Sequence, residues 1–199
     1  MSRIGLFGGT FDPPHLGHLA LAEQARDRLR LDEVRFIPAG QPPHKPRVRV
    51  SPAARRVAMT RLAVRGNPVF TVSTIEVRRG GPSFTVETLR RVARSAPRAR
   101  LYLLMGADSL DDFAAWREPH AILDLATLVV AGRPVGGRRR ARARLRVPRA
   151  RIVRLDNPEL ALSSSGVRAH VRAGRSVRYL VPDAVAAYIE RHRLYRGRA

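Results

Sequence analysis

The chain has 199 residues, which favours a single domain over residues 1–199 with a core large enough to be stable without covalent links. It has no cysteine, so disulfides, thiolate metal sites and a cysteine nucleophile are excluded, and we expect it to work in the reducing cytoplasm. The sequence shows neither a basic-then-apolar leader nor an apolar run long enough to cross a bilayer, and we expect no membrane partner.

The strong positive charge of the chain allows two interpretations. Arginine and lysine number 38 against 16 acidic residues, which gives a net charge of +22. A nucleic-acid binder could carry this excess, and so could a solvated, arginine-rich surface with some attraction for anionic substrates. Lys45 is the only lysine. Because arginine replaces lysine almost everywhere, a composition-wide bias explains the charge better than a binding patch, and we do not expect a nucleic-acid partner.

In the first third of the chain, apolar runs typical of buried strands alternate with helical patterns. The second expected helix begins with Ser51 as N-cap and Pro52 as first helical residue. The elements predicted here are a strand over 3–9, a helix over 16–29, a strand over 33–40, a proline-rich loop and a helix over 51–64.

The alternation continues to the end of the chain. The run "RLYLLMG" (100–106) is apolar throughout and ends in glycine, as a central parallel strand does. The other predicted elements are one or two strands over 69–79, a helix over 83–96, short helices over 108–116 and 118–126, strands over 127–132 and 151–155, and helices over 164–174 and 182–195.

This order predicts an α/β fold, a Rossmann-like parallel sheet with helices on both faces. In such sheets ligands bind beyond the carboxyl ends of the strands. The arginine-rich segment 132–151 is too charged to be buried, so we expect a solvated, mobile loop there. A nucleic-acid tail is the weaker alternative, because few aromatic residues are near it to stack on bases.

The segment after the first strand, "GGTFDPPHLGH" (8–18), has the residue types of a polyphosphate site. Gly8 and Gly9 let the backbone bend tightly and approach a ligand closely. The helix that follows begins with unpaired N–H groups at a positive dipole end, which attracts anions. His15 and His18 are three residues apart, so they face the same way if both lie in its first turn. Neither a P-loop nor a dinucleotide glycine pattern is present.

Two motifs together carry a family resemblance. "GGTFDPPHLGH" resembles the H-x-G-H signature of the adenylyl- and cytidylyltransferase superfamily, and its long form is similar to that of bacterial nicotinate-nucleotide adenylyltransferases. "LSSSGVR" (162–168) resembles their second signature, I-S-S-T-x-I-R, with conservative changes at Leu162, Ser165 and Val167. Alone, this run could be a helix cap with a surface arginine. Paired with the first motif, it favours phosphate contacts from the serines and from Arg168. The resemblance implies a nucleotidyltransferase fold.

Three further segments resemble this family: "PPHK" (42–45), "FTVETL" (84–89) and "GADSLDDFAAW" (106–116). The resemblance implies that Lys45 contacts phosphate, that Thr85 lies near the pyridine nucleotide, that Asp108 follows a strand at the site, and that Trp116 stacks on the nicotinate ring. The residues themselves allow plainer interpretations. Lys45 could be a solvated charge, Thr85 and Asp108 could be helix caps, and Trp116 could be a core or rim residue.

The resemblance implies transfer of AMP from ATP to nicotinate mononucleotide, which gives nicotinate adenine dinucleotide and pyrophosphate in NAD biosynthesis. Mg²⁺ is expected to arrive with ATP, held by phosphate oxygens and water, and no protein metal site is expected. The implied catalytic residues are His15, His18, Lys45 and Arg168. The implied ATP contacts are Gly8, Gly9, Thr10, Phe11, Gly106, Asp108, Ser163, Ser164 and Ser165; those for nicotinate mononucleotide are Thr85 and Trp116.

Other functions stay open on sequence alone. A sibling enzyme would adenylate pantetheine phosphate or transfer CMP. A class I aminoacyl-tRNA synthetase shares H-x-G-H, but its K-M-S-K-S signature is missing here. A non-enzymatic nucleic-acid binder would use the positive charge and leave both histidines without a role. A homo-oligomer is compatible with the sequence but not indicated by it.

Overall fold

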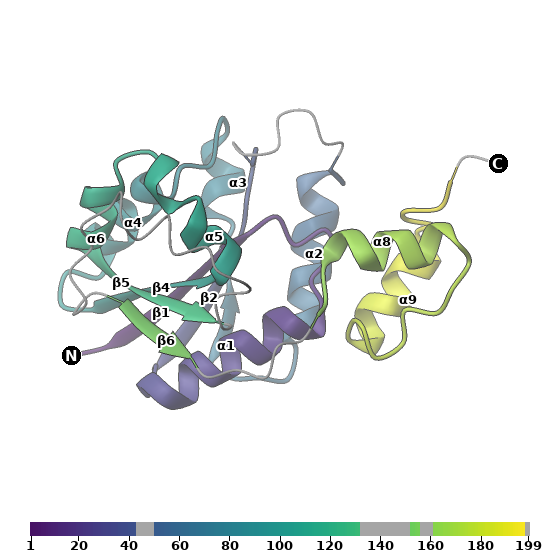
Figure 1. Ribbon diagram of the computed structural model, residues 1–199, viewed down its shortest axis with the longest axis horizontal. Helices are drawn as coiled ribbons and strands as arrows, with labels where there is room; N and C mark the ends of the chain where they lie inside the picture. Colours follow the sequence, from purple (N-terminus) through teal and green to yellow (C-terminus); the bar gives the residue numbers. More distant parts are fainter. Residues whose placement is uncertain (43–49, 132–151, 156–160, 198–199) are drawn as a thin grey trace.

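Six parallel strands form one sheet in the order β3-β2-β1-β4-β5-β6, as the ribbon in Figure 1 shows. The structure is a computed structural model, and it describes residues 1–42, 50–131, 152–155 and 161–197. Its strands are β1 (Arg3–Gly9), β2 (Glu33–Pro38), β3 (Phe70–Val72), β4 (Arg100–Gly106), β5 (Ala126–Ala131) and β6 (Ile152–Leu155). Its helices are α1 (Leu16–Leu29), α2 (Ala53–Val64), α3 (Ile75–Arg79), α4 (Thr85–Ser95), α5 (Ala107–Asp111), the 3-10 turn η1 (Phe113–Ala115), α6 (Pro119–Leu125), α8 (Ser164–Arg172) and α9 (Asp183–Arg191).

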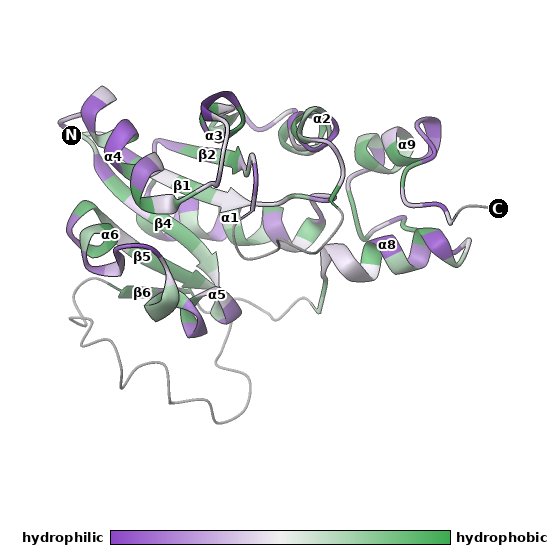
Figure 2. Ribbon diagram, turned by 90° about the horizontal axis from the view of Figure 1, so that it is seen from above, coloured by the Kyte–Doolittle hydropathy of each residue, from purple (hydrophilic) through white to green (hydrophobic). Residues whose placement is uncertain are grey.

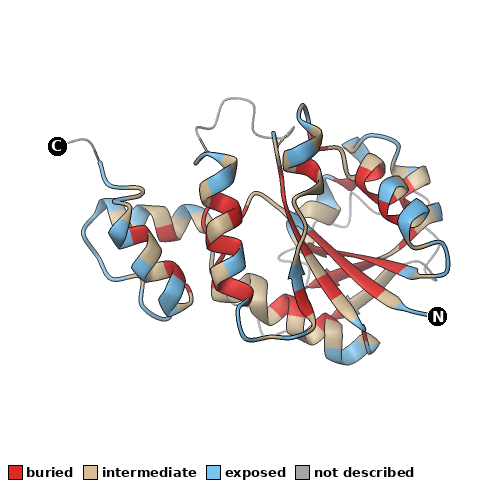
Figure 3. Ribbon diagram, turned by 180° about the vertical axis from the view of Figure 1, so that it is seen from behind, coloured by how far each residue is buried: buried red, intermediate tan, exposed pale blue. Residues whose placement is uncertain are grey.

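The central strands are apolar on both faces because helices cover both faces. Along β4, Leu103 faces one core cluster and its neighbour Leu104 faces another, as the two-residue period of a strand requires. Residues of α4 and α6 complete the first cluster, and residues of α1 complete the second. Figure 2 shows the resulting hydrophobic strands and Figure 3 their burial. The predicted α/β fold with helices on both faces is confirmed.

Two local predictions were wrong. The segment 69–79 forms one short strand, β3, and then the helix α3, where Arg78 N–H donates to the carbonyl of Thr74. Buried Glu76 anchors α3 by accepting a hydrogen bond from Thr88 Oγ1 at 2.7 Å, which overrides the β-propensity of its β-branched neighbours. Ser51 is not the cap of α2, because Pro52 has extended backbone (ψ 141°) and takes the N-cap position.

A third core cluster joins α8 and α9 to α2. Val167 of α8 and Val185 and Ile189 of α9 pack against Met59 and Ala63 of α2. Figure 1 shows this C-terminal pair of helices extending away from the sheet beside α2. Helix α2 therefore links the C-terminal helices to the sheet. No helix in the described parts of the chain is long and apolar enough to span a membrane. The single domain stays a prediction, and the expected loop 132–151 lies outside the described residues.

Candidate active site

Strand order reverses between β1 and β4, the point at which a parallel sheet of this kind is expected to have its ligand crevice. In parallel sheets this reversal is where ligands bind, beyond the carboxyl ends of the strands. Gly8, near the end of β1, has open space where a side chain would stand, with no atom within 4 Å of a built Cβ. Gly106 ends β4 and serves as N-cap of α5. Gly8 therefore leaves room for a phosphate to approach the end of β1, whereas a Cβ on Gly106 would stand 3.5 Å from Oδ1 of Asp108.

His15 and His18 lie together at the start of α1. Their ring centroids are 3.7 Å apart, and His15 is the N-cap residue. The backbone N–H of His15 donates to Nδ1 of His18 at 3.1 Å. Because Nδ1 accepts this bond, the hydrogen of the neutral His18 ring lies on Nε2. The fold thus prepares His18 as a donor through Nε2, and the predicted pairing of the two imidazoles is what the structure shows.

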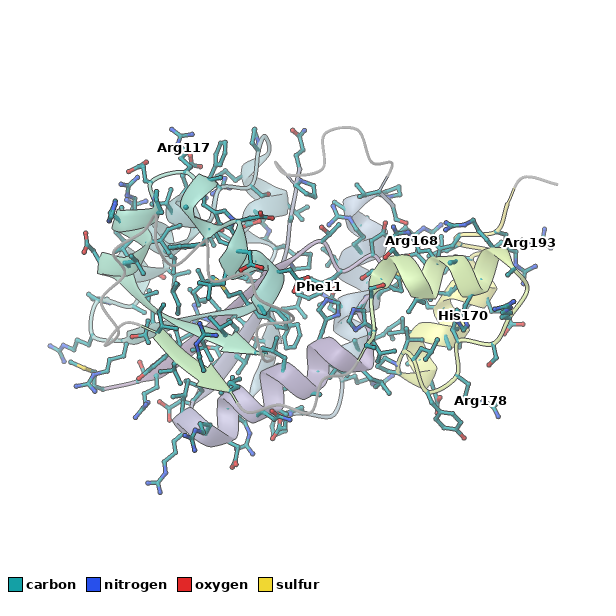
Figure 4. All side chains as sticks on the ribbon, viewed as in Figure 1. Phe11, Arg117, Arg168, His170, Arg178 and Arg193 are labelled. Carbon is teal, nitrogen blue, oxygen red and sulfur yellow. The ribbon has the colours of Figure 1, made fainter. Side chains whose placement is uncertain are left out.

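The ring of Phe11 packs against the ring of His18 and restricts its position. Phe11 adopts a left-handed backbone (φ 49°) and is 1% exposed, packed edge-on against Phe7 and against the His18 ring at centroid distances of 5.5 and 5.1 Å. Figure 4 shows Phe11 between the strand ends and α8. A Cβ on Gly9 would stand 2.9 Å from the Phe11 ring. Phe11, predicted as an ATP contact, can therefore offer a nucleotide only its backbone.

His15 is buried, which sets its charge. Removal from water lowers the pKa of His15 from 6.5 to about 4, and its Nδ1 has no hydrogen-bond partner among the described residues. At neutral pH the ring is therefore an uncharged donor or acceptor, not a cation. An anion bound beside it would meet a polar, neutral group.

This burial predicts a pH dependence of stability. The unfolded ring binds a proton near pH 6.5 and the folded ring only near pH 4, so stability is fully present above about pH 6.5 and is lost as pH falls toward 4. The loss from this group is about 2 kcal/mol at pH 5. Urea unfolding at pH 7.5 and pH 5 measures it, with His15→Asn as the comparison. Equal pH slopes in the two proteins would exclude this origin.

Gly17, the glycine of the H-x-G-H motif, makes room for His15. A Cβ there would lie 3.0 Å from His15 Nδ1 and 3.6 Å from Cβ of Leu162, which precedes α8. This glycine was not among the predicted site residues. Its role depends on the position of the His15 ring and on Leu162 before α8, which no local sequence pattern reveals.

Gly17→Ala is expected to lower kcat about tenfold, because the His15 ring must shift by a few tenths of an ångström and His18 with it. Alanine is the better helix former by roughly 1 kcal/mol, so the melting temperature should stay equal or rise. Steady-state kinetics and thermal unfolding measure the two effects. Unchanged kcat would show that His15 tolerates the shift.

The two sequence motifs meet at the start of α8. Ser164 Oγ donates to the carbonyl of Pro13 at 2.8 Å, and Arg168 Nη1 donates to the carbonyl of Asp12 at 2.7 Å. Ser163 is the N-cap of α8 and accepts from Gly166 N–H at 3.0 Å. Ser165 Oγ lies 3.0 Å from Ser163 Oγ. Ser164 and Arg168, predicted to contact phosphate, thus also hold the residues just before His15.

Besides Gly17, three residues of the site were missed by sequence reasoning. Arg56 of α2 is 1% exposed and donates to the carbonyls of Thr10, Gly40 and Ser51 at 3.0, 3.1 and 2.9 Å. Asp12, 2% exposed, accepts from the Tyr195 hydroxyl at 2.6 Å. Nothing in the sequence singles out one arginine among so many, nor a tyrosine near the last residue. Only Asp12 had a signal, its place in the first motif.

Thr85 and Trp116 lie on segments that touch one another. Arg117, next to Trp116, stands over the ring of Phe84 at 4.7 Å and pairs with Glu87 at 3.4 Å. Phe84 is the N-cap of α4, so Thr85 is the first helical residue and not its cap. Trp116 is partly buried beside Phe113, at a centroid distance of 5.4 Å. Figure 4 shows Arg117 at the end of the molecule opposite to α8.

Asp108 was predicted as an ATP contact and Lys45 as a catalytic residue. Asp108 lies in the first turn of α5, whose N-cap residue is Gly106, so Asp108 is not the cap of this helix. Lys45 lies outside the described residues, and its phosphate contact stays a prediction. Within the described ranges, no three histidine or acidic side chains gather as a metal site would require.

Known proteins match the chain over almost its full length. A family model described as cytidylyltransferase-like matches residues 6–170. A protein of Thermomicrobium roseum named "Probable nicotinate-nucleotide adenylyltransferase" is 46% identical over 98% of this chain and 92% of its own. A protein of the same name from Thermus thermophilus is 50% identical over 98% of this chain and 100% of its own.

Solved structures agree on the fold. Nicotinic acid mononucleotide adenylyltransferase of Plasmodium falciparum, complexed with NaAD, superposes with a TM-score of 0.81 over 98% of both chains at 15% identity. The same enzyme complexed with APC gives 0.78 over 98% of both chains, also at 15% identity. Taken with the two helix starts that meet beyond β1, these similarities show that the chain belongs to the cytidylyltransferase-like family and, within it, to the nicotinate-nucleotide adenylyltransferases.

Proposed function

We propose that this chain transfers AMP from ATP to nicotinate mononucleotide, releasing pyrophosphate and forming nicotinate adenine dinucleotide. Its family membership gives the reaction class. The observation that carries the proposal for this chain is the junction of its two motifs, where Ser164 and Arg168 of α8 hold the loop that presents His15 and His18. Two helix N-termini and two imidazoles are thereby brought to one strand end.

The reaction needs little from the protein beyond placement and charge stabilisation. A phosphate oxygen of nicotinate mononucleotide attacks the α-phosphorus of ATP, and the bond from that phosphorus to the bridging oxygen of pyrophosphate breaks. The attacking oxygen is already an anion, so no general base is required. Hydrogen-bond donors that meet the developing negative charge then supply most of the catalysis. This explains a site of donors without a nucleophile.

We assign each donor a proposed role. His18 Nε2–H would contact the α-phosphoryl group, with the neutral ring of His15 on a neighbouring oxygen. The first N–H groups of α8 lack intrahelical acceptors and, with Ser165, suit the outer phosphates. Arg168 and Lys45 would stabilise the leaving pyrophosphate. Gly8, Gly9, Thr10, Gly106 and Asp108 would line the adenosine side of the crevice.

Mg²⁺ fits this arrangement as a companion of ATP. It prefers octahedral oxygen ligands and keeps several waters, so phosphate oxygens can hold it. When bound, it would supply positive charge to the triphosphate. The side chains named above would then bind the nucleotide rather than the ion. These small-molecule substrates suit a cytoplasmic enzyme.

The pyridine nucleotide would be bound between the start of α4, at Thr85, and the end of η1, at Trp116. Trp116→Ala is expected to raise KM for nicotinate mononucleotide about tenfold with KM for ATP unchanged, since stacking of a base on an aromatic ring contributes roughly 1–3 kcal/mol. Trp116→Phe should keep most of the affinity. Equal KM values in wild type and Trp116→Ala would remove Trp116 from the pyridine site.

Pyrophosphate release on mixing tests the function directly. We expect release with Mg²⁺, ATP and nicotinate mononucleotide together, and none when either substrate is left out. Parallel reactions with pantetheine phosphate in place of the mononucleotide, and with CTP in place of ATP, test the sibling activities. Release with pantetheine phosphate alone among the acceptors would overturn the proposed function.

A further inference from the structure

Partly buried hydrogen bonds hold the loop 10–15, which we call the histidine loop, at several points. The carbonyls of Thr10, Asp12 and Pro13 each accept a side-chain hydrogen bond, from Arg56, Arg168 and Ser164 respectively. Asp12 adds its carboxylate: Oδ2 accepts from Ser51 N–H at 3.0 Å and Oδ1 from the Tyr195 hydroxyl at 2.6 Å. The loop is therefore positioned mainly by other segments.

Tyr195 reaches Asp12 across 183 residues of sequence. It lies in the turn after α9, where both Arg193 (φ 49°) and Tyr195 (φ 64°) adopt the left-handed backbone. Such backbone costs an L-residue of order 1 kcal/mol and persists where the surroundings enforce it. Here two such residues turn the chain end back toward α2, so that the phenol enters the site beside Met59, 3.7 Å from its sulfur.

The phenol is suited to be a permanent donor. Burial raises the pKa of Tyr195 well above its usual value, and the hydrogen bond to Asp12 and the charge of that carboxylate raise it further. The hydroxyl therefore stays protonated at neutral pH. It leaves Oδ1 of a 2%-exposed carboxylate satisfied, whose burial without a partner would be costly.

We infer that Tyr195 is a positioning residue for the reaction: through Asp12, the C-terminal turn sets the histidine loop so that His15 and His18 meet the triphosphate. The inference rests on the proposed function. It makes the C-terminal turn part of the catalytic arrangement, although Tyr195 itself touches no substrate. Loss of this contact should affect turnover and the binding of ATP, but not the binding of nicotinate mononucleotide. The predicted contacts of the mononucleotide, Thr85 and Trp116, lie on α4 and beside η1, away from Tyr195.

Tyr195→Phe removes only the hydroxyl, and Tyr188→Phe is a matched control. Tyr188 lies in α9 of the same helical pair, and its hydroxyl accepts from Arg55 Nη1 at 3.3 Å without touching the histidine loop. We expect Tyr195→Phe to lower kcat about tenfold and to raise KM for ATP, with KM for nicotinate mononucleotide within twofold of wild type. Tyr188→Phe should match wild type in all three constants.

Two further measurements separate positioning from general destabilisation. The imidazole NMR signals of His15 and His18 should move in Tyr195→Phe and stay in place in Tyr188→Phe. In an Asp12→Asn background, which weakens the bond, Tyr195→Phe should change kcat by less than twofold. Equal kcat in wild type and Tyr195→Phe, unmoved His15 and His18 signals, or an undiminished effect beside Asp12→Asn would each overturn the inference.

The NMR comparison needs no catalysis, so it also distinguishes failure of this inference from failure of the proposed function. If wild type releases no pyrophosphate but the two signals still move in Tyr195→Phe alone, the proposed reaction is wrong and the positioning contact stands. If Tyr195→Phe does not fold while Tyr188→Phe does, the hydroxyl has a general structural role and the inference is overturned.

Discussion

His18→Ala is expected to lower kcat by roughly 10²–10³, the usual cost of removing one well-placed donor to a charged transition state. His18 Nδ1 accepts from the backbone N–H of His15, so the hydrogen of the neutral ring lies on Nε2, which can act as the donor. The fold should remain, because α1 is anchored by buried Leu21, Ala22 and Ala25. Affinity for ATP should change little, since the donors proposed for the outer phosphates are other residues.

Single-turnover kinetics and ATP titration measure these two effects. His170→Ala is the matched control, because His170 lies on α8 with its Nδ1 3.2 Å from the carbonyl of Ser176, away from the histidine loop. That variant should turn over like wild type. A His18→Ala enzyme with near wild-type kcat would remove His18 from the mechanism.

Arg56→Met is expected to cost about 3–5 kcal/mol of unfolding free energy, the range seen when one partner of a buried charged network is removed. The guanidinium donates to three carbonyls, which would be left without this donor in the protein interior. The charge beside Asp12 would also be lost. Arg56→Lys keeps the charge but cannot replace a planar fork with five N–H donors. Its unfolding free energy should therefore lie between those of wild type and Arg56→Met.

We expect substitution of Arg56 to affect catalysis as well as stability. Gly40 and Ser51 stand on either side of the segment that carries Lys45. Arg56 donates to the carbonyls of both residues and to that of Thr10. The folded fraction of the Arg56→Lys protein should therefore have a lower kcat than wild type. Urea unfolding and kinetics at low temperature measure the two losses. Arg61→Met, an exposed position on the same helix, is the control, and an equal loss there would refute the special role of Arg56.

The sequence predicted the sheet well because its strands are apolar on both faces. Runs such as 3–9 and 100–106 can be buried only between two helical layers, and glycine marks where they end. The helix over 16–29 was confirmed with its bounds. The segment 69–79 was harder, because Ile75 and Val77 favour a strand while the buried hydrogen bond between Glu76 and Thr88 favours the helix that forms.

The site was predicted where a motif carries local chemistry and missed where contacts are distant in sequence. Spacing alone places His15 and His18 on one turn. Arg56 and Tyr195 act through carbonyl and carboxylate oxygens of other segments, which no local pattern reveals. Gly17 is similar: its need for a missing side chain depends on the His15 ring and on Leu162. Ser51 was predicted to cap α2, but its N–H and carbonyl bond Asp12 and Arg56 instead.

A crystal structure of the chain with a non-hydrolysable ATP analogue tests the central claim most directly. The account predicts the triphosphate in the crevice between β1 and β4, with an α-phosphoryl oxygen within hydrogen-bond distance of His18 Nε2 and the outer phosphates at the first turn of α8. A triphosphate bound away from both helix starts, with neither His15 nor His18 in contact, would contradict it.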